Sequence, residues 1–143
     1  MNALSELEAI QRLRAASSAR LLALDADTDE VYIVPVNFAC LERSIYFYTE
    51  PGRKLTVLQR HPDGAGLQTD GPTWSVLVTG RYRPAGLAER ALCTAALLAK
   101  YRALAVAPMW GKARGQWRPF LRELSRAQVG VIPIRAVSGR QWA

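Results

Sequence analysis

The residues best suited to binding chemistry lie in segment 45–62, IYFYTEPGRKLTVLQRHP, which changes from an aromatic strand pattern to a basic helical one. At the junction, Tyr48 is followed by the hydroxyl group of Thr49 and then by the positive charges of Arg53 and Lys54. A strand that leads into a helix also offers free backbone N–H donors and the positive end of the helix dipole. These groups together predict a site for a phosphate group.

The same junction has a purely structural interpretation. Thr49 or Glu50 could cap the helix, Pro51 could occupy its first turn, and Arg53 and Lys54 could be solvated surface charges. The local pattern by itself leaves both interpretations open.

Other site chemistries lack the residues they need. His61 is the only histidine, and beside the helix-ending Pro62 it is read as a surface or capping residue. Cys40 and Cys93 lie far apart without a CxxC partner, so we expect two buried free thiols in a reducing cytoplasm and no metal site. The chain has no GxxxxGK[ST] loop, and GAGLQT precedes a strand pattern, which argues against a dinucleotide fingerprint. The catalytic residues stay unknown, because no side chain can be named as a general acid or base.

Composition favours one domain over residues 1–143 with an anionic partner. The chain has 19 lysine and arginine against 12 aspartate and glutamate residues, a net charge of +7. The N-terminus, MNALSELEAIQRLRAA, carries two glutamates and no uninterrupted apolar run, so neither a signal peptide nor a membrane span is expected. We therefore expect a cytoplasmic protein without membrane contact.

The first half of the chain reads as a helix followed by a β-meander. Ser5 and Glu8 have capping-box spacing before an amphipathic helix. Segment 19–50 then reads as three antiparallel strands joined by turns at DADTDE and LERS. A helix starting near Pro51 and ending at His61–Pro62 follows.

The second half predicts three more strands around a long helix. AGLQTD and WSVLVTGRYR are strand patterns separated by the turn GPT, and an alanine-rich helix is expected from Leu87 to about Leu104. Segment 107–120 reads as an irregular loop, and 129–137 as a last strand in which Pro133 suggests an edge or a bulge. About six strands with flanking helices predict a mainly β, closed or nearly closed barrel.

Three motifs in order, VPVNFA, IYFYTEPGRKLTVLQRHP and WSVLVTGRYRP, resemble the FMN-binding split-barrel proteins related to pyridoxamine 5'-phosphate oxidase. The C-terminal VIPIRAVSGRQW is similar to the last strand of the short bacterial members. The similarity leaves out residues 1–16 and 87–128. It implies a six-stranded antiparallel split β-barrel of the FMN-binding type, which forms homodimers with FMN at the subunit interface.

The resemblance also implies a set of cofactor-binding residues. In the phosphate corner, Thr49 would bind the FMN phosphate through its hydroxyl and backbone, and Arg53 and Lys54 would pair with its charge. The isoalloxazine ring would lie along the strand that carries Pro35, Val36 and Asn37. Ser75 falls where the true oxidases keep a flavin-contacting glutamine. The full implied set is Pro35, Val36, Asn37, Tyr48, Thr49, Arg53, Lys54 and Ser75.

Two departures separate the chain from the true oxidase. Its YIVPVNFA strand lacks the basic residues that reach the phosphate there, and its C-terminus lacks the substrate-gripping arginine and histidine pattern. The chain looks more like the small, functionally diverse branch that includes proteins similar to nitroimidazole-resistance reductases, and the Lys100–Tyr101 pair also fits that branch. The resemblance thus implies an FMN-dependent oxidoreductase or reductase of a small molecule.

Two rival functions stay open. GKARGQWRPFLRELSR places Arg114, Arg118, Arg122 and Arg126 at four-residue spacing beside aromatic residues, which is compatible with a small basic barrel that binds nucleic acid. Pro119 interrupts the helix that would align these arginines, so nucleic acid is the less favoured partner. The same fold could also bind a deazaflavin or a heme, or hold FMN without turnover.

Overall fold

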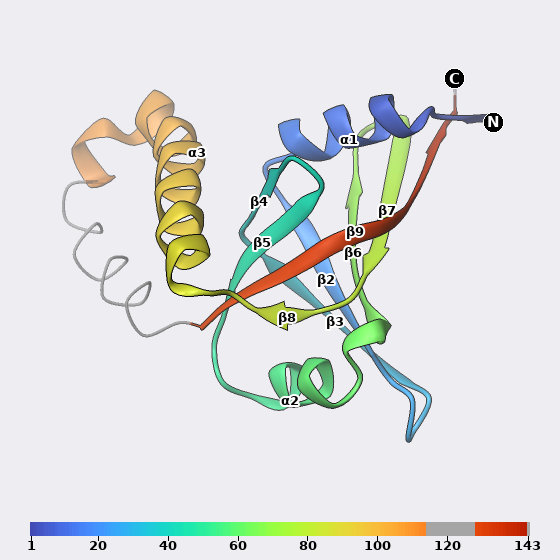
Figure 1. Ribbon diagram of the computed structural model, residues 1–143. Helices are drawn as coiled ribbons and strands as arrows, with labels where there is room; N and C mark the ends of the chain where they lie inside the picture. Colours follow the sequence, from blue (N-terminus) through green and yellow to red (C-terminus); the bar gives the residue numbers. More distant parts are fainter. Residues whose placement is uncertain (114–127, 143) are drawn as a thin grey trace.

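The computed structural model describes residues 1–113 and 128–142, with side chains to residue 101 and again from residue 128. Its centre is a strongly curled antiparallel sheet, with α1 across one end, α2 below the opposite end and α3 beside β4 and β5 (Figure 1). The strands are β1 Asn2–Ala3, β2 Ala19–Asp25, β3 Glu30–Val36, β4 Phe38–Leu41, β5 Ser44–Thr49, β6 Ala65–Asp70, β7 Trp74–Gly80, β8 Arg83–Pro84 and β9 Gln128–Gln141. The helices are α1 Glu6–Ala15, α2 Arg53–Arg60, the short 3₁₀ turn η1 Pro62–Gly64, and α3 Leu87–Ala113.

The strand order explains how the sheet closes on itself. Neighbouring strands run β3-β2-β6-β7-β9-β5-β4, so β3 and β4 occupy the two ends of the sheet although only Asn37 separates them in sequence. If β3 and β4 are taken as one strand bent at Asn37, six long strands build the barrel. The predicted split-barrel fold class is therefore confirmed.

The bend at Asn37 corrects the predicted meander. The sequence pattern indicated one uninterrupted middle strand, but its first half pairs with β2 and its second half with β5. Within the described residues, β3 pairs with β2 alone, so the backbone groups on its other edge have no strand partner. This free edge is the split in the barrel.

Helix α1 begins as the sequence predicts. The Ser5 hydroxyl accepts a hydrogen bond from the Glu8 backbone N–H at 3.2 Å, and the Glu8 carboxylate accepts one from the Ser5 N–H at 2.9 Å. These two bonds satisfy backbone donors that the first helical turn leaves without internal partners. The helix then buries Ala9, Ile10 and Leu13 against the barrel.

We expect Ser5→Ala to lower the free energy of unfolding by about 1 kcal/mol, the usual cost of losing an N-cap hydroxyl. Urea unfolding of both proteins measures the difference. Gln11→Ala, an exposed position in the same helix, serves as the control and should leave stability unchanged or slightly raised. Equal stability of the two variants would show that the capping box contributes nothing.

The last strand is central, which corrects part of the prediction for it. Strand β9 pairs with β5 on one side and with β7 on the other, so Pro133 does not lie at an edge. The strand does contain a bulge, but two residues after Pro133: Thr79 pairs with Ala136 and Gly80 with Ile134, which leaves Arg135 as the extra residue. A Cβ atom at Gly80 would run into the carbonyl oxygen of Pro133, so this crossing needs glycine.

Helix α3 is longer than predicted. It runs from Leu87 to Ala113, so the expected irregular segment is helical over 107–113, and residues 114–127 lie outside the described part. Pro108 and Gly111 in this segment indicated a loop, yet the helix continues through both residues. Buried Cys93 and Leu97 pack α3 against β4, β5 and β9, and both Cys40 and Cys93 are buried free thiols, as predicted. Within residues 1–113 and 128–142, none of the helices combines the length and hydropathy that a bilayer crossing requires.

Lys100 extends from α3 to β4, where its ammonium group donates a hydrogen bond to the carbonyl of Phe38 at 2.9 Å. Burial lowers the pKa of Lys100 to about 8, against a weaker upward effect of the neighbouring Cys40. Cys40 in turn faces Arg14 of α1, and Tyr101 is the next residue on α3. Among the described side chains, these are the titratable and charged groups near the Lys100 ammonium.

We expect this lysine to make stability rise with pH above about 8. Between the folded pKa of Lys100 and its ordinary value of 10.5, the folded state binds fewer protons than the unfolded state, so raising the pH favours folding. Cys93 opposes the trend above pH 9, because burial raises its pKa from 9.0 to about 12. The free energy of unfolding of wild type minus that of Lys100→Met should therefore increase from pH 8 to pH 9. Parallel pH profiles for the two proteins would contradict the expectation.

Candidate functional site

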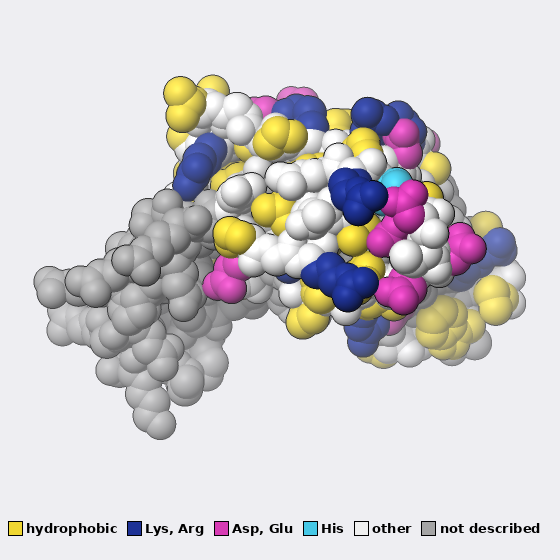
Figure 2. Space-filling model, turned by 90° about the horizontal axis from the view of Figure 1, so that it is seen from below, with side chains coloured by type: hydrophobic (Ala, Val, Ile, Leu, Met, Phe, Trp, Pro, Cys, Tyr) yellow, Lys and Arg dark blue, Asp and Glu magenta, His cyan; other side chains and the backbone are white. Residues whose placement is uncertain are grey.

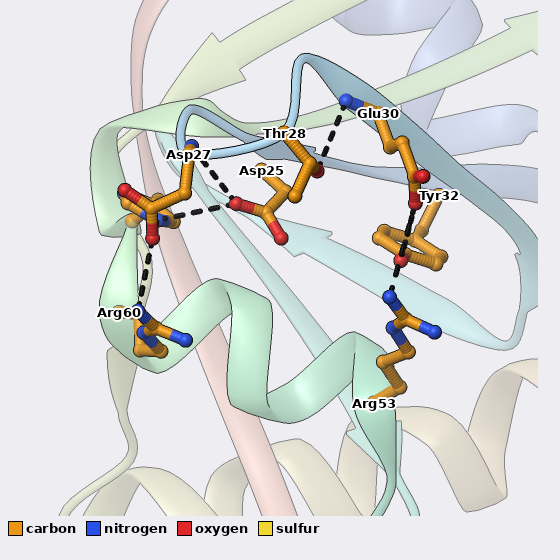
Figure 3. Close-up of polar contacts among 8 residues, drawn as sticks. Asp25, Asp27, Thr28, Glu30, Tyr32, Arg53 and Arg60 are labelled. Carbon is orange, nitrogen blue, oxygen red and sulfur yellow. Dashed lines mark hydrogen bonds and ion pairs between the residues drawn. The ribbon is translucent and has the colours of Figure 1, made fainter.

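The free edge of β3 faces the junction between β5 and α2. The side chain of Arg53, the first residue of α2, lies over the Tyr32 ring of β3 at 5.3 Å from the ring centre and contacts Glu30 at 3.9 Å. Figure 3 shows Arg53 pointing at Tyr32, whose hydroxyl donates to Glu30. The phosphate corner predicted from sequence therefore stands beside the split in the barrel.

Thr49 and Tyr48 point to opposite faces of β5. Thr49 is 3% exposed and lies on the same face as Ile45 and Phe47, which belong to the barrel core. Its hydroxyl has one weak contact, 3.3 Å to the carbonyl of Glu50. Tyr48 instead faces α3, where its hydroxyl meets that of Thr94. The side chains of the two predicted residues therefore do not meet in one site.

Helix α2 begins without a side-chain cap. Gly52 is its N-cap residue and makes no capping bond, so the structural alternative in which Thr49 or Glu50 caps the helix is wrong. The first helical hydrogen bond is Thr56 N–H to the carbonyl of Gly52. Among the residues that the structure describes, the N–H groups of the preceding turn consequently have no helical or side-chain partner.

The two cations at the start of α2 differ in their surroundings. The Arg53 side chain is 72% exposed and already engaged with Glu30 and Tyr32. Lys54 is half-buried, and within the described residues it forms no ion pair with a carboxylate. Burial lowers the pKa of Lys54, and the nearby charge of Glu50 opposes this shift. An ion pair between a phosphate group and Lys54 would therefore be more favourable than one with Arg53.

The predicted ring segment lies farther along β3. Pro35 points to the outer face of the sheet, while Val36 packs against the barrel core and exposed Asn37 forms the bend into β4. Asn37 is five residues beyond Tyr32, which corresponds to about 16 Å of strand. The phosphate corner and the ring segment are thus separated by a distance suited to an elongated ligand.

Ser75 lies beside a hollow on the outer face of the sheet, next to the lining residue Gln68. The hollow has a volume of about 260 Å³ and is lined partly by Arg20, Pro35, Gln68 and Asp70. The Gln68 amide donates to the Ser75 hydroxyl at 3.3 Å, and Arg20 contacts both Gln68 and Asp70. The structure therefore places Pro35 and Ser75 near one hollow, although they are 40 residues apart in the sequence. Gln68 lies inside a strand pattern, and no sequence signal identified it.

A second polar cluster was also missed by the sequence reading. Asp25, Asp27 and His61 bring one ligand atom each within 4.8 Å of one another, at the β2–β3 turn and the end of α2. His61 lies 3.0 Å from Asp27. Figure 3 shows that Asp27 also accepts a hydrogen bond from Arg60, at 2.9 Å. The face seen from below shows basic and acidic side chains interleaved around this histidine (Figure 2). His61 is the C-cap residue of α2, as predicted, and the cluster ties that helix to the β2–β3 turn.

Structural comparison identifies proteins with the same fold. An FAD-binding protein from Mesorhizobium loti superimposes with a TM-score of 0.72 at 23% identity, covering 99% of this chain and 98% of that one. An FAD-binding protein from Mycobacterium smegmatis gives 0.61 at 19% identity, with coverage of 99% and 100%. A heme-binding protein from the same organism gives 0.67 at 15% identity, with coverage of 93% and 52%. These similarities establish a shared fold.

Sequence comparison establishes the family. No curated protein sequence matches the chain. The family model described as pyridoxamine 5'-phosphate oxidase matches residues 5–141, which include the six long strands of the barrel and the corner at the start of α2. The chain therefore belongs to the pyridoxamine 5'-phosphate oxidase family.

Proposed function

We propose that this protein is an FMN-binding flavoprotein that acts as an oxidoreductase on a small molecule. The observation that carries the proposal is Lys54, a half-buried ammonium group without a described ion-pair partner at the uncapped start of α2. A phosphate group there would gain a charge-assisted hydrogen bond and the free N–H groups of the first helical turn. Two proteins of the same fold that are described as FAD-binding support a flavin as the ligand, and the choice of FMN rests on Lys54 and the start of α2.

The phosphate and the ring of the flavin would be bound by different residues, at the start of α2 and at the end of β3. Lys54, the backbone of Thr49 and the first turn of α2 bind the phosphate, and the backbone of Pro35 to Asn37 orients the flavin ring. Bound flavin supplies hydride or single-electron transfer, so the protein needs to contribute orientation, shielding from water and local charge. The absence of a proton-transfer constellation in the sequence is compatible with that role.

We also propose that the protein is a homodimer that covers the outer face of β2, β3 and β7. Large apolar side chains are exposed there: Leu24 41%, Val31 54%, Ile33 57% and Leu77 38%. The register places Leu24 beside Val31 and Leu22 beside Ile33, so the apolar face is continuous across β2 and β3. Gln68 of β6 lies between this face and Leu77 of β7. Exposed apolar patches of this kind mark interaction surfaces. A second copy would cover the face and enclose the hollow beside Pro35.

The single histidine favours flavin over heme. His61 is the only histidine in the chain, and it is held between the carboxylates of Asp25 and Asp27. A heme that used the commonest protein ligand would have to break both contacts. The proposed nucleic-acid stripe from Arg114 to Arg126 lies outside the described residues.

Titration of purified apo-protein with FMN, FAD and heme tests the proposal. We expect FMN to bind with a yellow flavin spectrum and FAD to bind much less well, because the corner at Lys54 fits a terminal phosphate and the chain lacks a fingerprint for a pyrophosphate. Equal affinity for FMN and FAD would contradict the phosphate corner. Binding of heme alone would contradict the flavin assignment.

A further inference from the structure

Two adjacent residues of α3 hold both backbone groups of Phe38. The Tyr101 hydroxyl accepts a hydrogen bond from the Phe38 N–H at 3.1 Å and donates one to the carbonyl of Ser17 at 3.2 Å. The Lys100 ammonium donates to the Phe38 carbonyl at 2.9 Å and lies 3.6 Å from the centre of the Phe38 ring. These contacts join α3 to the start of β4 and to the segment before β2.

Phe38 needs such partners because of its place in the fold. It is the first residue of β4, directly after the bend at Asn37, and β4 is an end strand of the sheet. The other edge of β4 pairs with β5, so within the described part of the chain the outward backbone groups of Phe38 have no strand to meet. Unpaired backbone groups in a partly buried position are costly. Lys100 and Tyr101 therefore fix the chain direction at the bend.

Lys100 is a costly choice for this position. Its ammonium group is half-buried, and it forms no ion pair with a carboxylate in the described part of the chain. A carbonyl and an aromatic ring compensate only in part for removing an ammonium group from water. An apolar side chain would pack α3 on β4 at lower cost, as Leu97 does one turn earlier on the helix. The charge thus points to a requirement beyond helix packing.

We propose that Lys100 and Tyr101 are positioning residues for the ring end of the flavin site, acting through the backbone of Phe38 on the bend at Asn37. The inference rests on the proposed function, because it takes the segment from Pro35 to Asn37 as the ring-binding strand. It assigns α3 a role at the end of the site opposite to Lys54.

Affinities for FMN and riboflavin distinguish the two ends of the site. Tyr101→Phe and Lys100→Met should each weaken both flavins by the same factor, about three- to tenfold, since each removes one hydrogen bond that fixes the ring segment. Lys100→Arg should recover part of the loss, because it restores a cationic donor. Leu97→Ala is the control: it loosens α3 on the sheet without touching Phe38, and it should lower the free energy of unfolding while leaving both affinities unchanged.

Three outcomes would overturn the inference. Wild-type flavin affinities in Tyr101→Phe and Lys100→Met would show that the contacts of Phe38 do not affect how the flavin ring is bound. If Leu97→Ala weakened FMN and riboflavin as much as Tyr101→Phe and Lys100→Met do, at a comparable free energy of unfolding, the loss of affinity would be due to helix packing alone. If wild-type protein binds neither flavin, the proposed function fails and the inference fails with it, a result distinct from wild-type binding with unaffected variants.

Discussion

Replacing Lys54 by alanine is expected to weaken FMN binding by about ten- to a hundredfold and to leave riboflavin binding unchanged. A charge-assisted hydrogen bond to a phosphate in a partly desolvated site contributes about 1.5 to 3 kcal/mol, which corresponds to that factor in the dissociation constant. Riboflavin lacks the phosphate, so removing the Lys54 side chain should not change its affinity. Fluorescence titration of wild type and variant with both flavins measures the four affinities.

Arg53→Ala is the matched control on the neighbouring residue. The Arg53 side chain is 72% exposed and is engaged with Glu30 and Tyr32, so its loss should change FMN affinity by no more than the ~0 to 1 kcal/mol typical of exposed charges. Unchanged FMN affinity in Lys54→Ala would show that the start of α2 is an ordinary strand-to-helix junction and does not bind the phosphate. A loss of riboflavin affinity as large as that of FMN would show that the substitution disturbs the fold instead of the phosphate contact.

Ile33→Asp is expected to dissociate the homodimer and, with it, to abolish tight flavin binding. Ile33 is 57% exposed at the middle of the outer sheet face, between Val31 and Pro35 on the same strand. A carboxylate buried there against an apolar surface would lack a partner, and such burial costs several kcal/mol. Light scattering gives the oligomeric state, and FMN titration of the same sample gives the affinity.

Leu7→Asp tests whether any exposed apolar position has this effect. Leu7 is 68% exposed on α1, away from the outer sheet face, and should leave both the dimer and FMN binding intact. A wild-type protein that is monomeric and still holds FMN would refute the dimer proposal. A dimer that survives Ile33→Asp would move the interface to another surface.

The sequence by itself determined the local elements. The Ser5–Glu8 spacing predicted the start of α1, the GPT turn predicted the hairpin of β6 and β7, and the strand-to-helix junction before Arg53 was found where it was expected. These features depend on residues a few positions apart, whose turn chemistry and hydrophobic period are written in the chain itself. The family motifs extended these elements to the split barrel, which the fold confirms.

Only the tertiary structure decided which segments meet. Apolar residues stand on both sides of Asn37, in YIVPV and FACL, so no local signal marked the change of strand partner there. Pro133 suggested an edge, yet β9 is central because its pairing with β5 and β7 is chosen by long-range burial. The same holds for Lys100 on Phe38, 62 residues away, and for His61 beside Asp27, 34 residues away. Contacts over such separations depend on how the whole sheet curls, which the periodicity of any single segment does not encode.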